Sequence, residues 1–455
     1  MNRVARRSIT VLVLVALLLA GFLFFLIEFF LQSPTWAVSA YSPHVVSKLD
    51  SGAVTDREGI LLLDMEGSWT YSSSEAIRKS TLHWVGDRLR NIQVPAVPNY
   101  YGELVSYDVW NGMYTFGGAE NSQGVITLTV SSQLQTVALE ALGDRKGTVA
   151  VYNYKTGEIL CAVTTPTYDP DNVPDIEGNP EQYEGAYMNR FIQSAYTPGS
   201  IFKIVTLAAA LDTLPDAQSM TFTCTGSWGG GEYPVTCESV HGTQTLQQAF
   251  CNSCNCAFAE LSATLGADAL SACVEKYGVM KSVRFDGIAS SAGNFEKASD
   301  SISLAWSAIG QYTDLVNPCS FLVYMGAIAG DGKAAVPYVV ASAEDGQAGY
   351  QAKTTYTDSV ISPQTAQILQ EYMRYNVENK YGDSNFPGLS VCAKTGTGEL
   401  DNGKASNAMF AGFVENEEYP LAFIICVEEG GYGRQTCVPI ASKVLSACKA
   451  FLDKE

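Results

Sequence analysis

Three short segments of the sequence carry side chains that could together perform acyl transfer. The first is the turn Pro198-Gly199 followed by Ser200 and, three residues later, Lys203. A serine hydroxyl is a weak nucleophile without a base beside it, and a lysine can be that base when its pKa is lowered. A Pro-Gly turn before an apolar helix puts Ser200 at a helix N-terminus with Lys203 one turn later on the same face. The same spacing recurs at Ser446 and Lys449, and a plain helix cap would also explain Ser200, so this segment alone is a weak signal.

The second and third segments are Ser253-Cys254-Asn255 and Lys394-Thr395-Gly396-Thr397-Gly398. The second precedes an apolar helix, and helix capping would explain it equally well by itself. The third follows the strand-like run 389–393, and an edge strand with a lysine, hydroxyls and small residues can bind an extended substrate and its carboxylate. A second Lys-Thr-Gly, at 155–157, lies in a predicted hairpin turn and is expected to be structural.

The combination of the three segments is far more specific than any one of them. Their order and their positions at the ends of predicted elements are those of penicillin-binding proteins and β-lactamases. The chain resembles the transpeptidase domain of class B, monofunctional penicillin-binding proteins, which are peptidoglycan D,D-transpeptidases. Other segments share the resemblance: 54–59, 156–160, 166–170, 189–190 with 196–200, and 309–311 with Pro318. Two features depart from the family: 408–412 has one aromatic residue instead of a pair, and Cys254 is unusual inside its motif.

The resemblance implies an α+β fold, in which an antiparallel sheet is flanked by helices and gathers strands from distant segments. The sequence pattern is consistent with this architecture. It predicts strands at 125–130, 148–152, 159–163, 408–414 and 421–427, and helices at 133–142, 201–211, 304–329 and 438–452. The third of these helices is expected to break near Asn317-Pro318.

The resemblance also assigns a role to each side chain of the three segments. Ser200 would attack the carbonyl between two D-alanines of a peptidoglycan stem peptide, Lys203 would take its proton, and Ser253 would relay a proton to the leaving amine. The implied substrate-binding residues are Asn255, Lys394, Thr395, Gly396 and Thr397. Among these, Asn255 would also hold Lys203, and Lys394 would lower the Lys203 pKa and attract the terminal carboxylate. The backbone N–H groups of Ser200 and Thr397 would form the oxyanion hole.

Three other functions use the same fold and stay open as alternatives. A D,D-carboxypeptidase would use water as the acceptor, and the long insertion between Asn255 and Lys394 argues for transpeptidation instead. A serine β-lactamase needs a group that activates the deacylating water, and the sequence does not identify one. A non-catalytic scaffold is disfavoured because all the reactive side chains are present.

The N-terminus has the features of a membrane anchor. Arg3, Arg6 and Arg7 precede an apolar run from Ile9 to Ile27, long enough to span a bilayer as a helix. We expect a cytoplasmic tail at 1–7, a transmembrane helix at 8–31, a β-rich membrane-proximal platform at 32–123 and the transpeptidase domain at 124–455, outside the bacterial cell membrane. A cleaved signal, with a weak cleavage site at 38–40, is the alternative.

Composition narrows the remaining choices. The chain has 455 residues and a formal charge of −19, which would repel nucleic-acid backbones. Only three scattered histidines occur, so a multi-histidine centre is excluded and neither a metal nor a cofactor is expected. Of the twelve cysteines, Cys224 and Cys237 bracket a Gly-rich loop and are predicted to form a disulfide. Zinc at the closely spaced cysteines 251, 254 and 256 is less favoured for want of a fourth ligand.

The expected partners follow from the same layout. The resemblance implies that β-lactams acylate the enzyme and that peptidoglycan stem peptides are its substrates. Only about 90 residues separate Leu31 from Gly124, too few for a second enzyme of ordinary domain size. We therefore expect a membrane glycosyltransferase partner, with Ala20 and Gly21 giving the anchor helix a small face for close packing.

Overall fold

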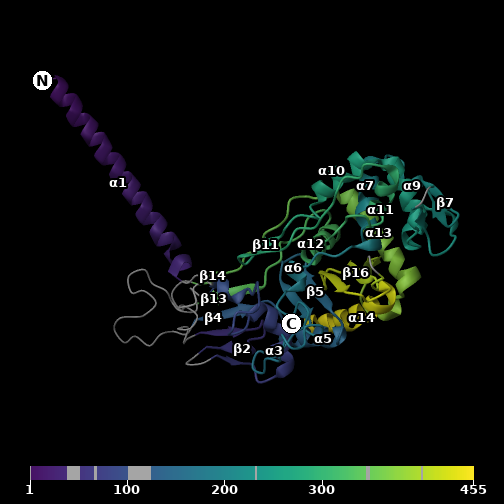
Figure 1. Cartoon of the computed structure of the whole chain (residues 1–455), viewed down its shortest axis with the longest axis horizontal. Helices are drawn as coiled ribbons and strands as arrows, with labels where there is room; N and C mark the ends of the chain where they lie inside the picture. The colour runs from purple at the N-terminus through teal and green to yellow at the C-terminus, as the bar shows by residue number, and fades with distance from the viewer. Residues whose placement is uncertain are drawn as a thin grey trace.

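The computed structural model describes residues 2–37, 52–65, 69–100, 124–230, 233–344, 349–400 and 403–454. Figure 1 shows a long N-terminal helix, a small sheet next to it, and a larger body of sheet and helices that contains the C-terminus.

The N-terminal helix is α1 (Asn2–Ala37). Its segment Arg3–Leu31 is long and apolar enough to cross a membrane, and none of it is buried against the rest of the chain. This is compatible with the expected single-pass anchor. The helix continues past Leu31 as far as Ala37, and the alternative cleavage site at 38–40 lies outside the described residues.

The small sheet has six strands in the order β14-β13-β4-β1-β2-β3. Their bounds are β1 (Ala53–Thr55), β2 (Leu61–Asp64), β3 (Thr70–Tyr71), β4 (Val125–Leu128), β13 (Val340–Glu344) and β14 (Tyr350–Gln351). The expected strand-turn-strand at 54–61 is present as β1 and β2, with the Asp56 carboxylate accepting from the N–H groups of Glu58 and Ile60. This sheet combines strands β1, β2 and β3 from before the predicted domain boundary at 123/124 with strands β4, β13 and β14 from after it. The boundary itself stays a prediction.

A helix in this region was missed by the sequence analysis. α3 (Glu75–Val85) packs on β2 and on α5 (Ser132–Leu142). Ser74 caps its N-terminus by accepting from the Ile77 N–H, and buried Trp84 lies near its end. The sequence did carry a local signal, an N-cap serine followed by an acid in the first turn. The helix was missed because it is too short for its apolar spacing to be distinctive.

The larger sheet has five antiparallel strands in the order β15-β16-β17-β5-β6. Their bounds are β5 (Gly147–Asn153), β6 (Ile159–Thr165), β15 (Val391–Gly398), β16 (Asn407–Val414) and β17 (Leu421–Val427). The predicted strands in these segments are therefore confirmed, as is the sheet that joins distant parts of the chain. The Lys-Thr-Gly at 155–157 lies in the β5–β6 turn, where Gly157 has a φ of +92°.

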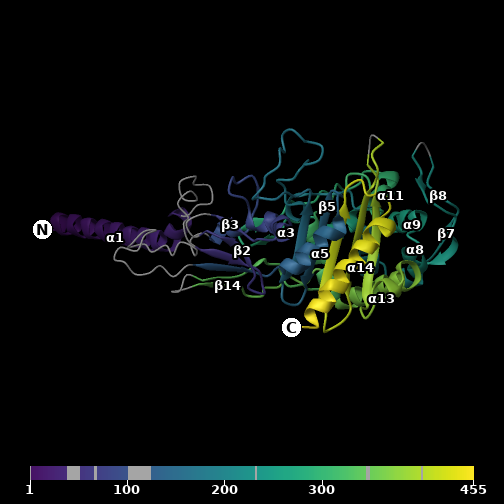
Figure 2. The ribbon, with the colours of Figure 1, turned by 90° about the horizontal axis from the view of Figure 1, so that it is seen from below.

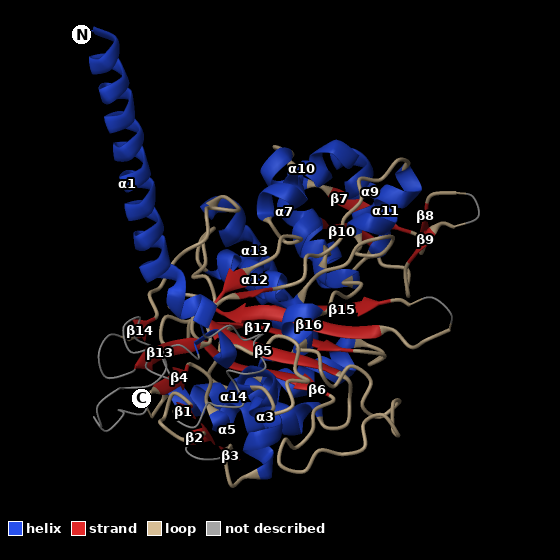
Figure 3. Cartoon of the chain, turned by 60° about the vertical axis from the view of Figure 1, so that its left-hand side comes forward, coloured by secondary structure: helices blue, strands red, loops and turns tan. Residues whose placement is uncertain are grey.

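Helices cover both faces of this sheet (Figures 2 and 3). On one face lie α5 and α14 (Gly433–Leu452), and on the other α12 (Pro318–Ala329) packs on β16 and β17. Successive residues of a strand point to opposite faces. On β17, Phe423 and Ile425 therefore belong to the α14 core, whereas Ala422 and Ile424 belong to the core that continues into the helical region.

The helical region lies beyond α12 and carries the nucleophile segment. Its helices are α7 (Lys203–Thr213), α8 (Leu246–Cys251), α9 (Asn255–Leu265), α10 (Ala267–Tyr277), α11 (Ser301–Ala308) and α13 (Pro363–Asn376). Its short strands are β7 (Thr221–Cys224), β8 (Ser227–Trp228), β9 (Val235–Thr236) and β10 (Gly242–Thr245). The hairpin of β11 (Arg284–Phe285) and β12 (Ile288–Ala289) instead contacts the small sheet, because Asp286 in its turn accepts from the Val339 and Val340 N–H groups. The short helix α6 (Arg190–Gln193), which comes before the nucleophile segment, packs on β5, β6 and α12. The predicted helix at 304–329 is confirmed as two pieces, α11 and α12. The predicted helix at 201–211 starts later, because a 3-10 turn, Gly199–Ile201, precedes α7.

Candidate active site

Ser200 lies in the middle of the 3-10 turn rather than at an α-helical cap. The turn is fixed by hydrogen bonds from the Gly199 N–H to Gly310 O at 2.8 Å and from the Phe202 N–H to Gly199 O at 2.9 Å. Gly199 has a φ of +53°, and a Cβ there would meet Thr397 O at 2.2 Å. The glycine therefore lets the turn approach the strand that carries the third motif.

Lys203, the first residue of α7, is fully buried with its amine beside Ser200. Its Nζ donates to Ser200 Oγ at 3.0 Å, to Asn255 Oδ1 at 2.6 Å and to the Ser253 carbonyl at 2.8 Å. Burial lowers the pKa of Lys203 to about 8, although nearby thiols and the Glu238 carboxylate oppose the shift. An amine with that pKa is neutral in about one molecule in ten at pH 7 and can then accept the serine proton.

Ser253 lies in the tight turn between α8 and α9. Its φ of +54° is unusual for a residue with a side chain and marks a turn held by its surroundings. The turn is fixed by hydrogen bonds from the Ser253 N–H to Phe250 O at 3.1 Å and from the Cys254 N–H to Ala249 O at 2.9 Å. In this conformation the Ser253 hydroxyl lies between two lysines.

The second of these lysines is Lys394 on β15. Its Nζ donates to Ser253 Oγ at 3.0 Å and to Thr395 O at 3.1 Å, and Lys203 Nζ lies 3.3 Å from the same hydroxyl. Burial, followed by the charge of Lys203, holds the pKa of Lys394 well below its usual value. The two amines and one hydroxyl form a continuous path along which a proton can move.

The rest of the third motif lies on the edge strand of the sheet, because β15 is the terminal strand. A Cβ on Gly396 would meet Pro198 O at 2.5 Å, and one on Gly398 would meet Thr197 O at 2.1 Å. Both glycines are therefore required for β15 to pack against the nucleophile turn. Thr395 and Thr397 are half-buried and line the cavity above Ser200. The structure thus brings together all eight predicted site residues, from four separate elements.

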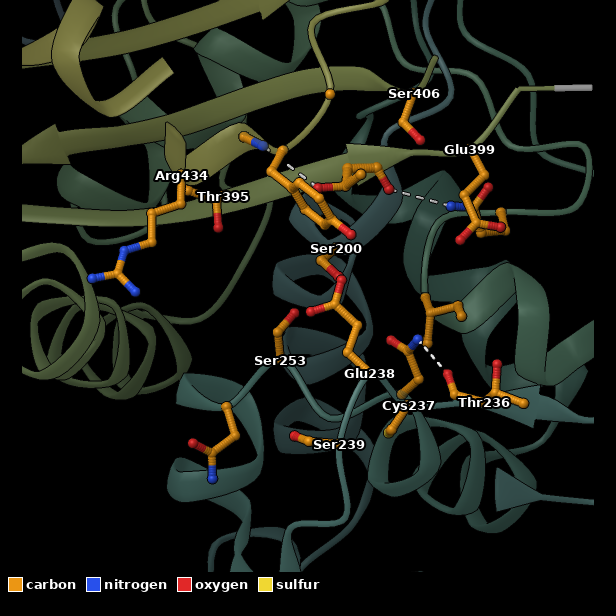
Figure 4. A pocket seen from close by; sticks show the side chains of 18 of the residues that line it. Ser200, Thr236, Cys237, Glu238, Ser239, Ser253, Thr395, Glu399, Ser406 and Arg434 are labelled. Carbon is orange, nitrogen blue, oxygen red and sulfur yellow. Dashed lines mark hydrogen bonds between the residues drawn. The ribbon is translucent and has the colours of Figure 1, made fainter. Parts of the chain in front are cut away.

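The cavity at this junction has a volume of about 770 Å³, within the usual range for ligand sites. In the close-up, Ser200, Ser253 and Glu238 face a common space, with Thr395 and Arg434 on the sheet side (Figure 4). Gln311, from the 309–311 segment that shares the resemblance, lines the cavity, and lining residues that the sequence analysis missed include Glu238, Trp306, Lys380, Glu399, Tyr432 and Arg434. They come from loops and helix ends with no recognisable motif, so no local pattern could have identified them.

Tyr381 was also missed and supports the third motif from behind. Its buried hydroxyl accepts from the Thr395 N–H at 3.0 Å and hydrogen-bonds Thr395 Oγ1 at 3.0 Å. It is the last residue of the π-helical turn Val377–Tyr381 that follows α13. A single tyrosine at a helix end carries no sequence signal for this role.

The predicted disulfide between Cys224 and Cys237 is wrong, because both are free thiols in the structure. Cys237 instead lies 3.7 Å, Sγ to Sγ, from Cys254 and 3.4 Å from Cys256. The error arose because sequence proximity suggested one partner, whereas the fold brings cysteines from the second motif to the same place. Cys161, Cys392 and Cys426 are buried core residues, as predicted.

Comparison with known proteins agrees with this geometry. Residues 147–446 match the penicillin binding protein transpeptidase domain. The chain is 28% identical over 342 residues to the peptidoglycan D,D-transpeptidase PbpA of Mycolicibacterium smegmatis, covering 70% of each chain.

Two solved structures are also similar. A D,D-transpeptidase domain from Eggerthella lenta is 26% identical, with a TM-score of 0.73 over 88% of this chain and 98% of that one. A ceftriaxone acyl-enzyme of penicillin-binding protein A from M. tuberculosis is 23% identical and shares the fold, with a TM-score of 0.75 over 88% of this chain and 99% of that one. The family match spans most of the chain and all eight predicted site residues, so the chain belongs to the penicillin-binding protein transpeptidase family, in its class B branch.

Proposed function

We propose that this chain is a serine D,D-transpeptidase that cross-links peptidoglycan stem peptides through an acyl-enzyme on Ser200. The observation that carries the proposal is the position of Lys203 Nζ, 3.0 Å from Ser200 Oγ and held there by Asn255 and Ser253. A buried amine held in this way can act as the base for the Ser200 hydroxyl.

Acylation would begin when neutral Lys203 takes the Ser200 proton as Oγ attacks the carbonyl between the two terminal D-alanines. The negative charge on the carbonyl oxygen would be stabilised by the backbone N–H groups of Ser200 and Thr397, and one such donor contributes about 3–4 kcal/mol. The proton would then pass from Lys203 through the Ser253 hydroxyl to the leaving amine, and terminal D-alanine would depart. The contacts of Ser253 with both lysines support this route.

Deacylation would reverse these steps with a different amine. An amine of a neighbouring stem peptide would lose a proton to the same Lys203–Ser253 pair as it attacks the acyl carbonyl, and Ser200 would recover its proton. Lys394 and the hydroxyls of Thr395 and Thr397 would bind the terminal carboxylate of the donor peptide. A β-lactam would acylate Ser200 by the same first step, because its strained amide occupies the place of the D-alanyl bond.

The assignment of Ser200 is tested by covalent labelling. Fluorescent penicillin should label the wild-type protein at the peptide that contains Ser200, and Ser200→Ala should abolish labelling without lowering the thermal unfolding temperature. Ser446→Ala is the matched control, since that serine has the same spacing to a lysine but lies in α14. Full labelling of Ser200→Ala would contradict the assignment.

The reaction class is tested with a D-Ala-D-Ala donor peptide and an acceptor amine. A transpeptidase should give the cross-linked product, whereas a carboxypeptidase would release D-alanine and leave only the hydrolysed donor. Rapid, repeated hydrolysis of a chromogenic β-lactam would instead indicate a β-lactamase.

The membrane arrangement is part of the same proposal. We infer that α1 spans the membrane with Arg3, Arg6 and Arg7 on the cytoplasmic side, since positive flanks remain inside. The catalytic body would then lie outside, where stem peptides are exposed. Gly21 lies on an open surface of α1, and a Cβ added there would have no atom within 4 Å, so a partner helix could pack closely at this point.

A membrane glycosyltransferase would be that partner, because cross-linking needs glycan strands. The purified full-length protein should make no glycan polymer from lipid-linked precursor. Polymer formed by the protein alone would contradict the need for a partner.

A further inference from the structure

Three thiols and one imidazole meet beside the second motif, and two of these residues, Cys237 and His241, also line the active-site cavity. The Sγ atoms of Cys224, Cys237 and Cys254 and a ring nitrogen of His241 all lie within 4.8 Å of one another. In a tetrahedral zinc site with Zn–S bonds near 2.3 Å, two sulfur atoms are about 3.8 Å apart. The Cys237–Cys254 separation is 3.7 Å. The cluster therefore already has nearly the dimensions of a metal site.

The imidazole provides an independent indication of a missing ligand. His241 Nε2 lies 3.3 Å from Ser239 Oγ, whereas Nδ1 is buried and has no hydrogen-bond partner among the described residues. A buried ring nitrogen without a partner is costly. A metal-ligating histidine commonly uses one nitrogen for the metal and hydrogen-bonds the other, which is the pattern found here.

The backbone holds the four ligands in place from three separate segments. Cys224 ends β7 and is paired in register with Gly242, the first residue of β10, which directly follows His241. Cys237 follows β9, and its N–H donates to Gly226 O at 3.0 Å. Cys254 is the N-cap of α9. Cys224 and Cys254 are almost fully buried, so water cannot satisfy the cluster from that side.

We propose that Cys224, Cys237, His241 and Cys254 bind one zinc ion, which fixes the Ser253–Asn255 turn to the loop that forms the adjacent side of the active site. Thiolate sulfur and imidazole nitrogen are the ligands that zinc prefers, and four protein ligands make a closed, structural site with no position left for water or substrate. A zinc ion satisfies all four groups together. A single disulfide would leave one thiol and the buried Nδ1 unpaired. This site departs from the expectation that no metal binds.

The consequence for the active site follows from the position of Cys254 between Ser253 and Asn255. Asn255 Nδ2 also donates to Thr236 O at 2.8 Å, next to Cys237, so the turn and the loop already touch on the active-site side. Zinc would join the turn and the loop a second time, through Cys254 on the turn and Cys237 and His241 on the loop. The four ligands are positioning residues: they hold Ser253 and Asn255, which in turn hold Lys203.

The first experiment measures metal content and needs no activity. Full-length protein purified in detergent without chelators is analysed by mass spectrometry of its metals, and about one zinc per chain is expected. Cys237→Ser and His241→Ala should lose at least about nine-tenths of this zinc. Cys273→Ser, which removes a buried thiol on α10 outside the cluster, should retain it. Absence of zinc from the wild type, or full zinc content in Cys237→Ser, would overturn the proposal.

The second experiment examines the ligands in the wild-type protein, so it does not depend on a variant that folds. Replacement of the metal by Co²⁺ should give the intense visible bands of tetrahedral cobalt and charge-transfer bands from thiolate. Alkylation of the denatured, unreduced protein should modify Cys224, Cys237 and Cys254 as free thiols. A disulfide among these three, or a weak octahedral cobalt spectrum, would overturn the proposal.

The positioning role is tested separately and rests on the proposed function. Removal of zinc from the wild type should slow labelling by fluorescent penicillin at least about tenfold, and added Zn²⁺, but not Mg²⁺, should restore the rate. Unchanged labelling after removal would overturn the positioning role while the metal content stands. If Ser200 were not the nucleophile, Ser200→Ala would still be labelled in the zinc-loaded protein, so the two failures are distinguishable.

Discussion

The active-site cavity has two walls that are built in different ways. The strand wall is β15, where eight consecutive residues pair with β16 and two glycines pack against the nucleophile turn. The loop wall consists of 236–241 and 253–255, where the β8–β9 ladder has only two residue pairs. Side-chain contacts hold this second wall instead. Asn255 Nδ2 donates to Thr236 O, and the Sγ atoms of Cys237 and Cys254 lie against each other. We therefore expect substitutions that add atoms to disturb the strand wall, and substitutions that remove side chains to disturb the loop wall.

The largest effect is expected where the two walls meet, at Lys203. Lys203→Ala removes the base of Ser200 and the amine that Ser253 and Asn255 hold. The second-order rate of acylation by a fluorescent penicillin should fall by about 10²–10⁴. Lys281→Ala, at an exposed lysine after α10, is the control and should leave the rate unchanged. A Lys203→Ala rate within threefold of wild type would show that neither wall positions a base.

A pair of glycine substitutions tests the difference between the walls directly. In Gly396→Ala the new Cβ would meet Pro198 O at 2.5 Å and Ile201 Cγ2 at 3.0 Å, so the strand and the nucleophile turn must separate. A displacement of this size can cost about 100-fold in rate. In Gly230→Ala, near the loop wall, no atom lies within 4 Å of the new Cβ, and the rate should not change. Equal acylation rates for the two variants would remove the distinction.

Lys203 must be neutral to accept the serine proton, so the rate of acylation should depend on pH. This dependence tests the loop wall, because Glu238 of that wall acts on the Lys203 pKa. Burial lowers the Lys203 pKa to about 8, so the rate should rise about tenfold per pH unit below 8 and level off above it. The Glu238 carboxylate raises that pKa, so Glu238→Gln should move the inflection to lower pH. Glu399→Gln, which changes another carboxylate of the cavity, is the control. An inflection that moves to higher pH in Glu238→Gln would contradict this electrostatic assignment.

The strand wall and the large sheet were predictable from the sequence because their signals are local. Apolar runs such as 408–414 and 421–427 become β16 and β17, whose residues are buried on both faces. Lys394-Thr395-Gly396-Thr397-Gly398 occupies one strand, so its geometry follows once the strand is identified. Gly396 and Gly398 are in the motif because a strand must approach the nucleophile turn there.

The loop wall was largely unpredictable because its contacts join residues whose spacing in the sequence follows neither a helical nor a strand pattern. Cys237 was assigned to Cys224 from proximity in sequence, but Cys254 reaches it from the turn between two helices. Glu238 enters the cavity from an irregular loop. The resemblance placed Ser253 and Asn255 correctly beside Lys203, whereas the positive φ of Ser253 has no signature in its own neighbourhood.

The smallest effect is expected from a side chain behind the strand wall. Tyr381→Phe removes a hydroxyl that accepts from the Thr395 N–H and hydrogen-bonds Thr395 Oγ1. Because β15 is also held by its ladder with β16, the strand should keep its place, and acylation should slow only a few-fold. The unfolding free energy should fall by about 1–3 kcal/mol, since a buried N–H loses its partner. Tyr356→Phe removes an exposed hydrogen bond to Lys155 O and should change stability by less than about 0.5 kcal/mol. A loss of acylation in Tyr381→Phe as large as in Gly396→Ala would mean that side chains, and not the backbone ladder, position the strand wall.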